Sequence, residues 1–267
     1  MKFLARTVRG IESRSDDRRP QPTDVSLRVH LQPELTTVGV RVGVAPLHRR
    51  PYRQASRSAS LRPPLARALV LLAGMEPACT LLDPFCGAGT IPIEAALAAP
   101  GVACEGGDVD PAVLALARDN ASRAGVPVQF QTTDARALPH RSSSIDRVAT
   151  NPPWGQSVPA SGPLVGAWRD IRRVLREDGR VALLAPGDLV REAGETLSLP
   201  LALRNPVSVL GQHVEIAVLA PDGELTTPGQ LLSGHLSDAH ARYADAVPAA
   251  PPAGHPSSPP TASRPGG

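Results

Sequence analysis

The chain has 267 residues, of which 42% are hydrophobic and 20% charged, and these values predict one compact domain with some excess length. No uncharged apolar stretch reaches 18 residues, and the charged first ten residues have no apolar segment behind them, which argues against a membrane span and a signal peptide. We therefore expect a cytoplasmic protein. The three cysteines form no CxxC pair and have no histidine cluster nearby, so we expect reduced thiols, no disulfide framework and no metal site.

Charge is distributed unevenly along the chain. Residues 1–60 contain 12 Lys+Arg and 5 Asp+Glu, a net charge of +7, whereas the remainder contains 16 and 20, a net charge of −4. A basic region of this kind suggests a nucleic-acid partner, although a solvated basic surface has the same composition.

The first elements are expected in the basic region. Residues 24–31 and 37–44 are rich in β-forming residues and are separated by a Gln-Pro-Glu turn, which predicts a hairpin. Residues 13–23, charged and proline-containing, are expected to form a loop. A basic cluster with one aromatic residue follows at residues 48–53, and apolar residues at helical spacing then predict a helix over residues 61–73.

From residue 79 onward, strand and helix patterns alternate. Helices are expected over residues 90–99, 111–124, 164–176 and 188–197, and strands over residues 79–83, 102–108, 128–131, 145–150, 180–185, 201–209 and 213–219. This alternation predicts a parallel sheet with helices on both faces, in which one of the last two strands runs antiparallel. We expect a basic N-terminal region and linker (1–60), an α/β domain (61–220) and a mostly disordered tail (221–267), whose Pro/Ala/Ser-rich part begins near residue 246.

A glycine-containing turn joins the first strand of this domain to its first helix, in the run Asp83-Pro84-Phe85-Cys86-Gly87-Ala88-Gly89-Thr90. In a doubly wound sheet this position borders the ligand crevice, and glycines there allow a cofactor to approach the backbone. The run lacks the Gly-Lys-Ser/Thr ending of a phosphate loop and the third glycine of the dinucleotide motif. A tight turn without a ligand would also contain such glycines.

Two carboxylates follow at the ends of the next strands. Asp108 lies about 20 residues after the glycines, where an acid can accept hydrogen bonds from both hydroxyls of a ribose. Asp110 is expected to cap the helix that begins at Pro111. Asp134 is placed to accept a hydrogen bond from an adenine amino group, and an ordinary loop acid is the alternative interpretation.

The segment Asn151-Pro152-Pro153-Trp154-Gly155 follows the fourth strand. Two prolines stiffen it and remove backbone donors, so the Pro152 carbonyl and the Asn151 side-chain oxygen can both act as acceptors toward one point. With the planar ring of Trp154 beside them, these acceptors suit an exocyclic amine on a flat target. A proline-rich turn with a buried tryptophan is the alternative, and Trp168, on a helix, is expected to serve packing.

These motifs resemble those of the THUMP-associated, S-adenosylmethionine-dependent RNA (tRNA/rRNA) guanine-N2 methyltransferases. The resemblance rests on residues 82–96, on Gly107-Asp108-Val109-Asp110-Pro111 and on residues 151–155, and the basic residues 47–53 resemble the stretch that precedes the catalytic domain in that family. It implies a Rossmann-like, seven-stranded class I methyltransferase sheet with S-adenosylmethionine as cofactor. Two departures are the tryptophan at residue 154, where the family usually has Tyr or Phe, and a chain start that leaves the N-terminal RNA-binding domain truncated.

The resemblance also implies roles for individual residues. Asn151, Pro152, Pro153 and Trp154 would form the catalytic loop, Arg49, Arg50 and Arg53 would contact the substrate RNA, and the cofactor would be held by Asp83, Phe85, Gly87, Gly89, Thr90, Asp108, Asp134, Ala135 and Asn151. The enzyme would supply mainly alignment and two acceptors for the amine, because the methyl group is already activated on a sulfonium.

Three functional hypotheses remain from the sequence. The first is methylation of the N2 amine of a guanosine in RNA, with tRNA as the expected substrate; a separate protein would then supply the missing RNA-binding surface. The second keeps the chemistry on DNA adenine-N6, DNA cytosine-N4 or protein glutamine-N5. The third is a non-catalytic RNA-binding or partner subunit that has kept the fold.

Overall fold

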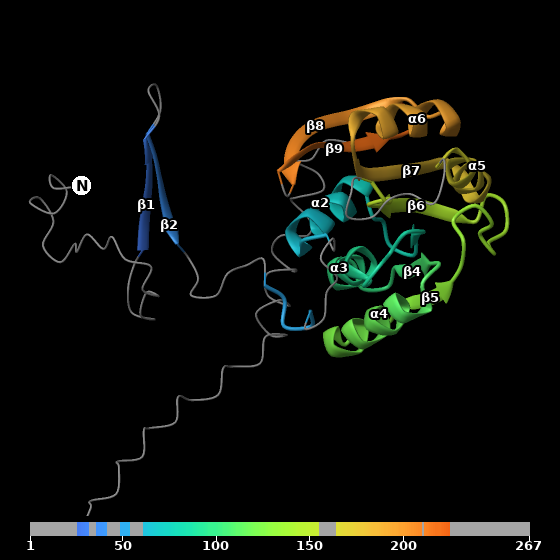
Figure 1. The fold of residues 1–267 in the computed structure, drawn as a ribbon, viewed down its shortest axis with the longest axis horizontal. Coiled ribbons are helices and arrows are strands. Elements are labelled where there is room, and N and C mark those ends of the chain that lie inside the picture. Colours follow the sequence, from blue (N-terminus) through green and yellow to red (C-terminus); the bar gives the residue numbers. More distant parts are fainter. Residues whose placement is uncertain are drawn as a thin grey trace, which may run out of the picture. The chain divides into compact units, whose positions relative to one another are not determined.

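The structure is a computed structural model that describes residues 26–31, 36–41, 49–53, 61–154, 164–209 and 211–224 (Figure 1). The chain divides into two units, Met1–Arg50 and Pro51–Gly267. The loop predicted at residues 13–23 and the proline-rich tail predicted from residue 246 lie outside the described residues.

The described part of the first unit includes a two-stranded hairpin. Strands β1 (Ser26–Leu31) and β2 (Thr36–Arg41) are antiparallel, with Ser26 opposite Arg41 and Leu31 opposite Thr36. This confirms the predicted hairpin, whose expected outer ends at residues 24 and 44 lie outside the described residues.

The second unit contains a seven-stranded sheet whose strand order is β5-β4-β3-β6-β7-β9-β8. All neighbouring strands are parallel except that β9 is antiparallel to both β7 and β8 (Figure 1). The prediction of a mostly parallel sheet with one antiparallel strand among the last two is therefore confirmed. In chain order the elements are α2 (Pro63–Ala73), β3 (Thr80–Asp83), α3 (Thr90–Ala98), β4 (Ala103–Asp108), α4 (Pro111–Ala124), β5 (Gln129–Thr132), β6 (Ile145–Thr150), α5 (Val165–Val174), β7 (Leu175–Ala185), α6 (Gly187–Leu197), β8 (Leu201–Val209) and β9 (Gln212–Leu219).

The junction of α5 and β7 differs from the prediction. The helix expected to reach residue 176 ends at Val174, and the strand expected from residue 180 already begins at Leu175. Leu175 is fully buried and pairs with Ile145, and the next registered pair of these strands is Arg147 with Arg180. The intervening residues 176–179 form an irregularity in β7 whose polar sequence, Arg-Glu-Asp-Gly, resembles a turn more than a strand.

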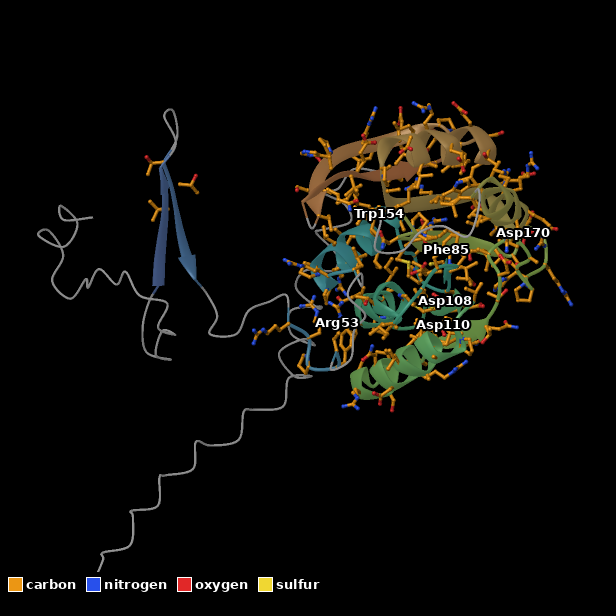
Figure 2. The ribbon with its side chains drawn as sticks, in the orientation of Figure 1. Arg53, Phe85, Asp108, Asp110, Trp154 and Asp170 are labelled. Atoms are coloured by element: carbon orange, nitrogen blue, oxygen red, sulfur yellow. The ribbon has the colours of Figure 1, made fainter. Side chains whose placement is uncertain are left out.

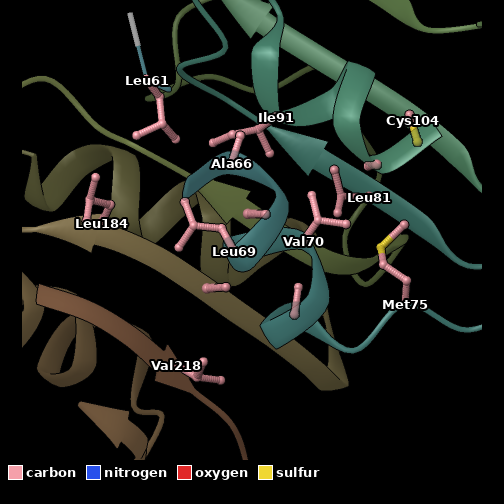
Figure 3. Close-up of a cluster of buried hydrophobic side chains, with 14 of the residues drawn as sticks. Leu61, Ala66, Leu69, Val70, Met75, Leu81, Ile91, Cys104, Leu184 and Val218 are labelled. Carbon is pink, nitrogen blue, oxygen red and sulfur yellow. The ribbon is translucent and has the colours of Figure 1, made fainter. Parts of the chain in front are cut away.

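Two hydrophobic clusters cover the two faces of the sheet. Alternating strand residues contribute to them. Leu81 packs with helix α2 in one cluster (Figure 3). Its neighbour Leu82 packs with α5 and α6 in the other. Because successive side chains of a strand point to opposite faces, this division places helices on both sides of the sheet, as the sequence predicts. No helix in the described part of the chain is long and apolar enough to cross a membrane.

Tyr52, near the start of the second unit, contacts helix α3. Tyr52 is only 5% exposed and packs with Ile93 and Ala121 in a third, smaller cluster. Its hydroxyl donates a 2.9 Å hydrogen bond to Oε1 of Glu94, which is itself 1% exposed. A second bond, from Nη1 of Arg67 to the Glu94 carbonyl at 2.9 Å, ties α2 to the same turn of α3.

Candidate active site

The two glycines of the turn between β3 and α3 have different surroundings. Both adopt positive φ angles, 52° at Gly87 and 79° at Gly89. A Cβ atom on Gly89 would lie 2.8 Å from the ring of Phe130, so close packing against β5 requires a glycine there. At Gly87 a Cβ would meet no described atom within 4 Å. The backbone at Gly87 is thus open, as a cofactor cradle requires.

Asp108 joins this turn to the end of β4. Its Oδ2 accepts a 3.0 Å hydrogen bond from the backbone N–H of Gly87, and its Oδ1 accepts one of 3.0 Å from the N–H of Asp110. Figure 2 shows Asp108 and Asp110 close together at this sheet edge. Each carboxylate oxygen keeps a further lone pair, so the half-buried group can still accept from a diol. Asp110 caps α4 as predicted, accepting from the N–H of Ala112 at 2.9 Å.

Val109, between these two acids, is a residue that the sequence prediction missed. Its side chain is 65% exposed, one of few large apolar side chains in the described residues that reach solvent to this extent. An apolar side chain at the end of β4, next to the acid predicted to bind a ribose, offers a flat base a surface to pack on. The signal in the sequence is an apolar residue placed between two aspartates, directly after a strand.

Asp134 and Ala135 follow β5, and the structure gives Asp134 a partner that the sequence did not suggest. Arg136 binds both carboxylate oxygens, with Nε 3.0 Å from Oδ1 and Nη2 2.6 Å from Oδ2, and its backbone N–H donates to Oδ1 at 2.9 Å. These hydrogen bonds lower the pKa of Asp134. Ala135 is buried. An adenine amino group at this carboxylate would therefore share it with Arg136.

Asp83 is a buried carboxylate at the centre of the site. It is 1% exposed, and its Oδ1 accepts hydrogen bonds from the Thr150 hydroxyl at 2.7 Å and from the N–H of Phe85 at 3.1 Å. Burial raises the pKa of Asp83 to about 7; the two hydrogen bonds oppose this rise and the charge of Asp108 adds to it. Thr150 immediately precedes Asn151, so the contact brings the glycine turn and the predicted catalytic loop together.

The neighbouring motif residues are largely built into the core. Phe85 is half-buried and meets Trp168 edge to face, with ring centroids 6.5 Å apart. Thr90, the first residue of α3, is buried. Trp168 is fully buried and donates a 3.1 Å hydrogen bond to Glu192, which confirms that it serves packing.

The loop after β6 contains a hydrogen bond between its two most polar side chains. Nε1 of Trp154 donates to Oδ1 of Asn151 at 2.9 Å and also approaches the carbonyl of Leu184 at 3.2 Å. Pro152 is buried, whereas Asn151, Pro153 and Trp154 are half-buried. The indole packs against both large hydrophobic clusters. Gly155 lies outside the described residues.

The three arginines expected to bind RNA fall in different parts of the chain. Arg49 is exposed and Arg50 half-buried, and both belong to the first unit. Arg53 belongs to the second unit, where it is half-buried, and burial lowers its pKa (Figure 2).

A cavity of about 220 Å³ opens on one face of the sheet over β3, β4 and β5. The side chains of His140 and Glu105, with Nε2 2.9 Å from Oε2, lie in its wall. None of its lining residues belongs to the glycine turn or to the loop at residues 151–154. Three of them, Leu82, Gly107 and Thr133, directly precede a predicted cofactor residue in the sequence. This cavity was not predicted, because no sequence pattern marks it.

Comparisons with known proteins identify relatives of this chain. Residues 50–191 match the family described as "RMKL-like, methyltransferase domain". A tRNA (guanine(6)-N2)-methyltransferase of Thermus thermophilus is 38% identical over 168 residues, which are 62% of this chain and 48% of that protein. The U6 snRNA (guanine-N(2))-methyltransferase THUMPD2 of Bos taurus is 32% identical over 192 residues, 70% of this chain and 37% of that protein.

The fold comparison agrees with these relationships. The crystal structure of TrmN from Thermus thermophilus has a TM-score of 0.61 at 34% sequence identity, covering 73% of this chain and 59% of that one. The chain spans about half, or less, of the length of the curated relatives it matches. The family match covers more than half of the chain and includes the glycine turn, Asp108 and the loop at residue 151. The chain therefore belongs to the RMKL-like methyltransferase-domain family.

Proposed function

We propose that this chain transfers a methyl group from S-adenosylmethionine to the exocyclic N2 amine of a guanosine in RNA, with tRNA as the substrate. The observation that carries the proposal is the Asp83–Thr150 hydrogen bond, which joins a cofactor-type glycine turn to an Asn-Pro-Pro-Trp loop at one sheet edge. Two relatives support the choice of acceptor, because their names specify guanine-N2 in two different RNAs, a tRNA and U6 snRNA.

The residues around the glycine turn fit S-adenosylmethionine. Open backbone at Gly87 and the free lone pairs of Asp108 suit the methionine end and the ribose, respectively. Val109 and Ala135 would contact the adenine, whose amino group would reach Asp134. The remaining cofactor residues would be Asp83, whose carboxylate suits the methionine ammonium group, and Phe85, Gly89, Thr90 and Asn151, which shape the pocket.

The catalytic loop would hold the target amine by two acceptors. When bound, S-adenosylmethionine supplies a methyl group on a positively charged sulfur, which is a good leaving group. Oδ1 of Asn151 and the carbonyl of Pro152 would accept the two N–H bonds of the amine, aligning the nitrogen lone pair and stabilising the positive charge that develops on it. The Trp154 ring would stack on the flipped base. The proton would leave through these acceptors to water after transfer.

RNA binding would involve the arginines that precede the predicted α/β domain. Arg49, Arg50 and Arg53 would contact phosphates, and a separate protein would supply further RNA-binding surface. Because tRNA is the proposed substrate, we infer a cytoplasmic location.

The test is methyl transfer by the purified chain to total tRNA, U6 snRNA, DNA and a glutamine-containing protein, followed by mass spectrometry of the products. The expected product is N2-methylguanosine. Asn151→Ala should lower the single-turnover rate at saturating S-adenosylmethionine by about 10²–10³. Asp110→Ala is the matched control, because Asp110 caps a helix at the same sheet edge. Methylation of DNA or of glutamine, with every RNA unmodified, would overturn the substrate assignment.

A further inference from the structure

The hydrogen bond between Trp154 and Asn151 determines the orientation of the Asn151 amide. An indole N–H can only donate, so the Asn151 atom 2.9 Å from it must be the oxygen. The amide of an asparagine can otherwise be turned by half a rotation, with its NH₂ group in place of the oxygen. Here the donor-only partner fixes which of the two groups lies on which side.

This orientation matters for an acceptor. With one lone pair bound to the indole, Oδ1 of Asn151 keeps a second lone pair for a substrate donor. In the reversed amide, the NH₂ group would face the N–H bonds of the target amine. Both groups are donors, so no hydrogen bond could form between them. We propose that Trp154 is a positioning residue whose indole N–H holds the Asn151 amide in the orientation that presents its oxygen to the target amine. This inference rests on the proposed function and extends it.

The surroundings of Trp154 support a fixed donor. The indole is packed against both large hydrophobic clusters, and its N–H also approaches the Leu184 carbonyl at 3.2 Å, which anchors the ring to β7. The donor is thus held by the core, independently of Asn151. A phenylalanine in its place would keep an aromatic ring and lose the N–H. This substitution therefore separates stacking on the base from the hydrogen bond to Asn151.

The hydrogen bond can be tested without any activity, because the chain contains only two tryptophans. In a ¹H–¹⁵N spectrum the indole signal that disappears in Trp154→Phe belongs to Trp154. In Asn151→Ala this signal should move upfield, while that of Trp168 stays in place. In Glu192→Ala, which removes the Trp168 acceptor, the Trp168 signal should move upfield and that of Trp154 should stay in place. An unchanged Trp154 signal in Asn151→Ala would overturn the inference.

The positioning role is tested by a double-mutant cycle in single-turnover kinetics. Trp154→Phe should lower the rate at saturating RNA by about 5-fold, the usual effect of losing one hydrogen bond. In the Asn151→Ala background, the same substitution should leave that rate unchanged, since the contribution passes through Asn151. Urea unfolding shows that each variant is folded, and the rates are measured at saturating S-adenosylmethionine.

Two outcomes of the cycle would overturn the inference. In one, Trp154→Phe raises the RNA concentration that gives half the maximal rate and leaves the rate at saturating RNA unchanged. In the other, Trp154→Phe lowers the rate as much in the Asn151→Ala background as in the wild type. Failure of the proposed function looks different: the wild-type protein would methylate no RNA, while the indole signal would still respond to Asn151→Ala.

Discussion

The hydroxyl of Thr150 donates a 2.7 Å hydrogen bond to Asp83, and this bond joins the last residue of β6 to the last residue of β3 inside the protein. Thr150 is fully buried and Asp83 nearly so. The residues that follow each of them form the proposed catalytic loop and the glycine turn. The two segments therefore start from strand ends that a buried hydrogen bond holds together, and such a bond is stronger in the interior than it would be in water.

The buried Asp83 predicts a specific dependence of stability on pH. Its pKa is about 7 in the folded protein and near the ordinary 3.8 in the unfolded chain. Well below pH 3.8 both states are protonated, and the carboxyl has no effect. Between pH 4 and 7 the unfolded chain ionises first, so the free energy of unfolding falls as pH rises and levels off above pH 7. The total loss is of order 4 kcal/mol.

Asp83→Asn should remove this pH dependence. The amide oxygen can still accept from Thr150 and Phe85, whose bonds both reach Oδ1 in the wild type. Urea unfolding of both proteins at pH 4 and pH 8 measures the effect, and all other titrating groups cancel in the comparison. If the free energy of unfolding changed with pH equally in both proteins, folding would not raise the pKa of Asp83.

Asp108→Ala should weaken S-adenosylmethionine binding by about 1.5–3 kcal/mol, because it removes a charged acceptor for the ribose. Asp110→Ala should instead lower the stability by about 1 kcal/mol through the loss of a helix cap, with cofactor affinity unchanged. Calorimetric titration and urea unfolding separate the two effects. Wild-type affinity in Asp108→Ala would remove this residue from the cofactor site.

Val109→Ala should weaken cofactor binding about 5-fold, because it removes two apolar carbons from the proposed adenine contact. The stability should change by less than about 0.5 kcal/mol, since the side chain is 65% exposed. Leu201→Ala is the control, a substitution of another exposed apolar residue, on strand β8. Equal affinities of Val109→Ala and the wild type would show that Val109 does not meet the cofactor.

Replacing Arg49 and Arg50 together with alanine should reduce the salt dependence of RNA binding. Removing one phosphate contact lowers the slope of log affinity against log salt by roughly 0.7–0.9. Arg53 is left in place, because burial lowers the pKa of its guanidinium, so its removal would also disturb packing in the second unit. Arg169→Ala, a change of an exposed arginine on α5, is the control. A slope like that of the wild type would exclude Arg49 and Arg50 as phosphate contacts.

The sheet and its helices were predictable because their residues alternate or repeat with a clear period. Helix α4 begins and ends where predicted, since Asp110-Pro111 and Gly125 mark its two ends. The start of β7 was not predictable, because residues 176–179 are polar and include a glycine. Their place in the sheet depends on Leu175 pairing with Ile145, a contact between residues distant in sequence.

The positions of the candidate site residues along the backbone were predictable, whereas the hydrogen-bond partners of their side chains were not. Glycines and acids at strand ends could be placed from spacing alone. The pairing of Asp134 with Arg136 and the bond from Trp154 to Asn151 could not, because each competes with other partners in the folded protein. The exposure of Val109 likewise depends on what neighbouring loops leave uncovered.

The contact of Tyr52 with α3 limits how far the chain can be shortened. A fragment that starts at residue 61 would keep every strand of the large sheet and every predicted cofactor residue. It would nevertheless expose the apolar surface that Tyr52 covers on Ile93 and Ala121, and would deprive the buried Glu94 of its phenol donor. A minimal fragment for binding or crystallisation therefore has to begin before Tyr52.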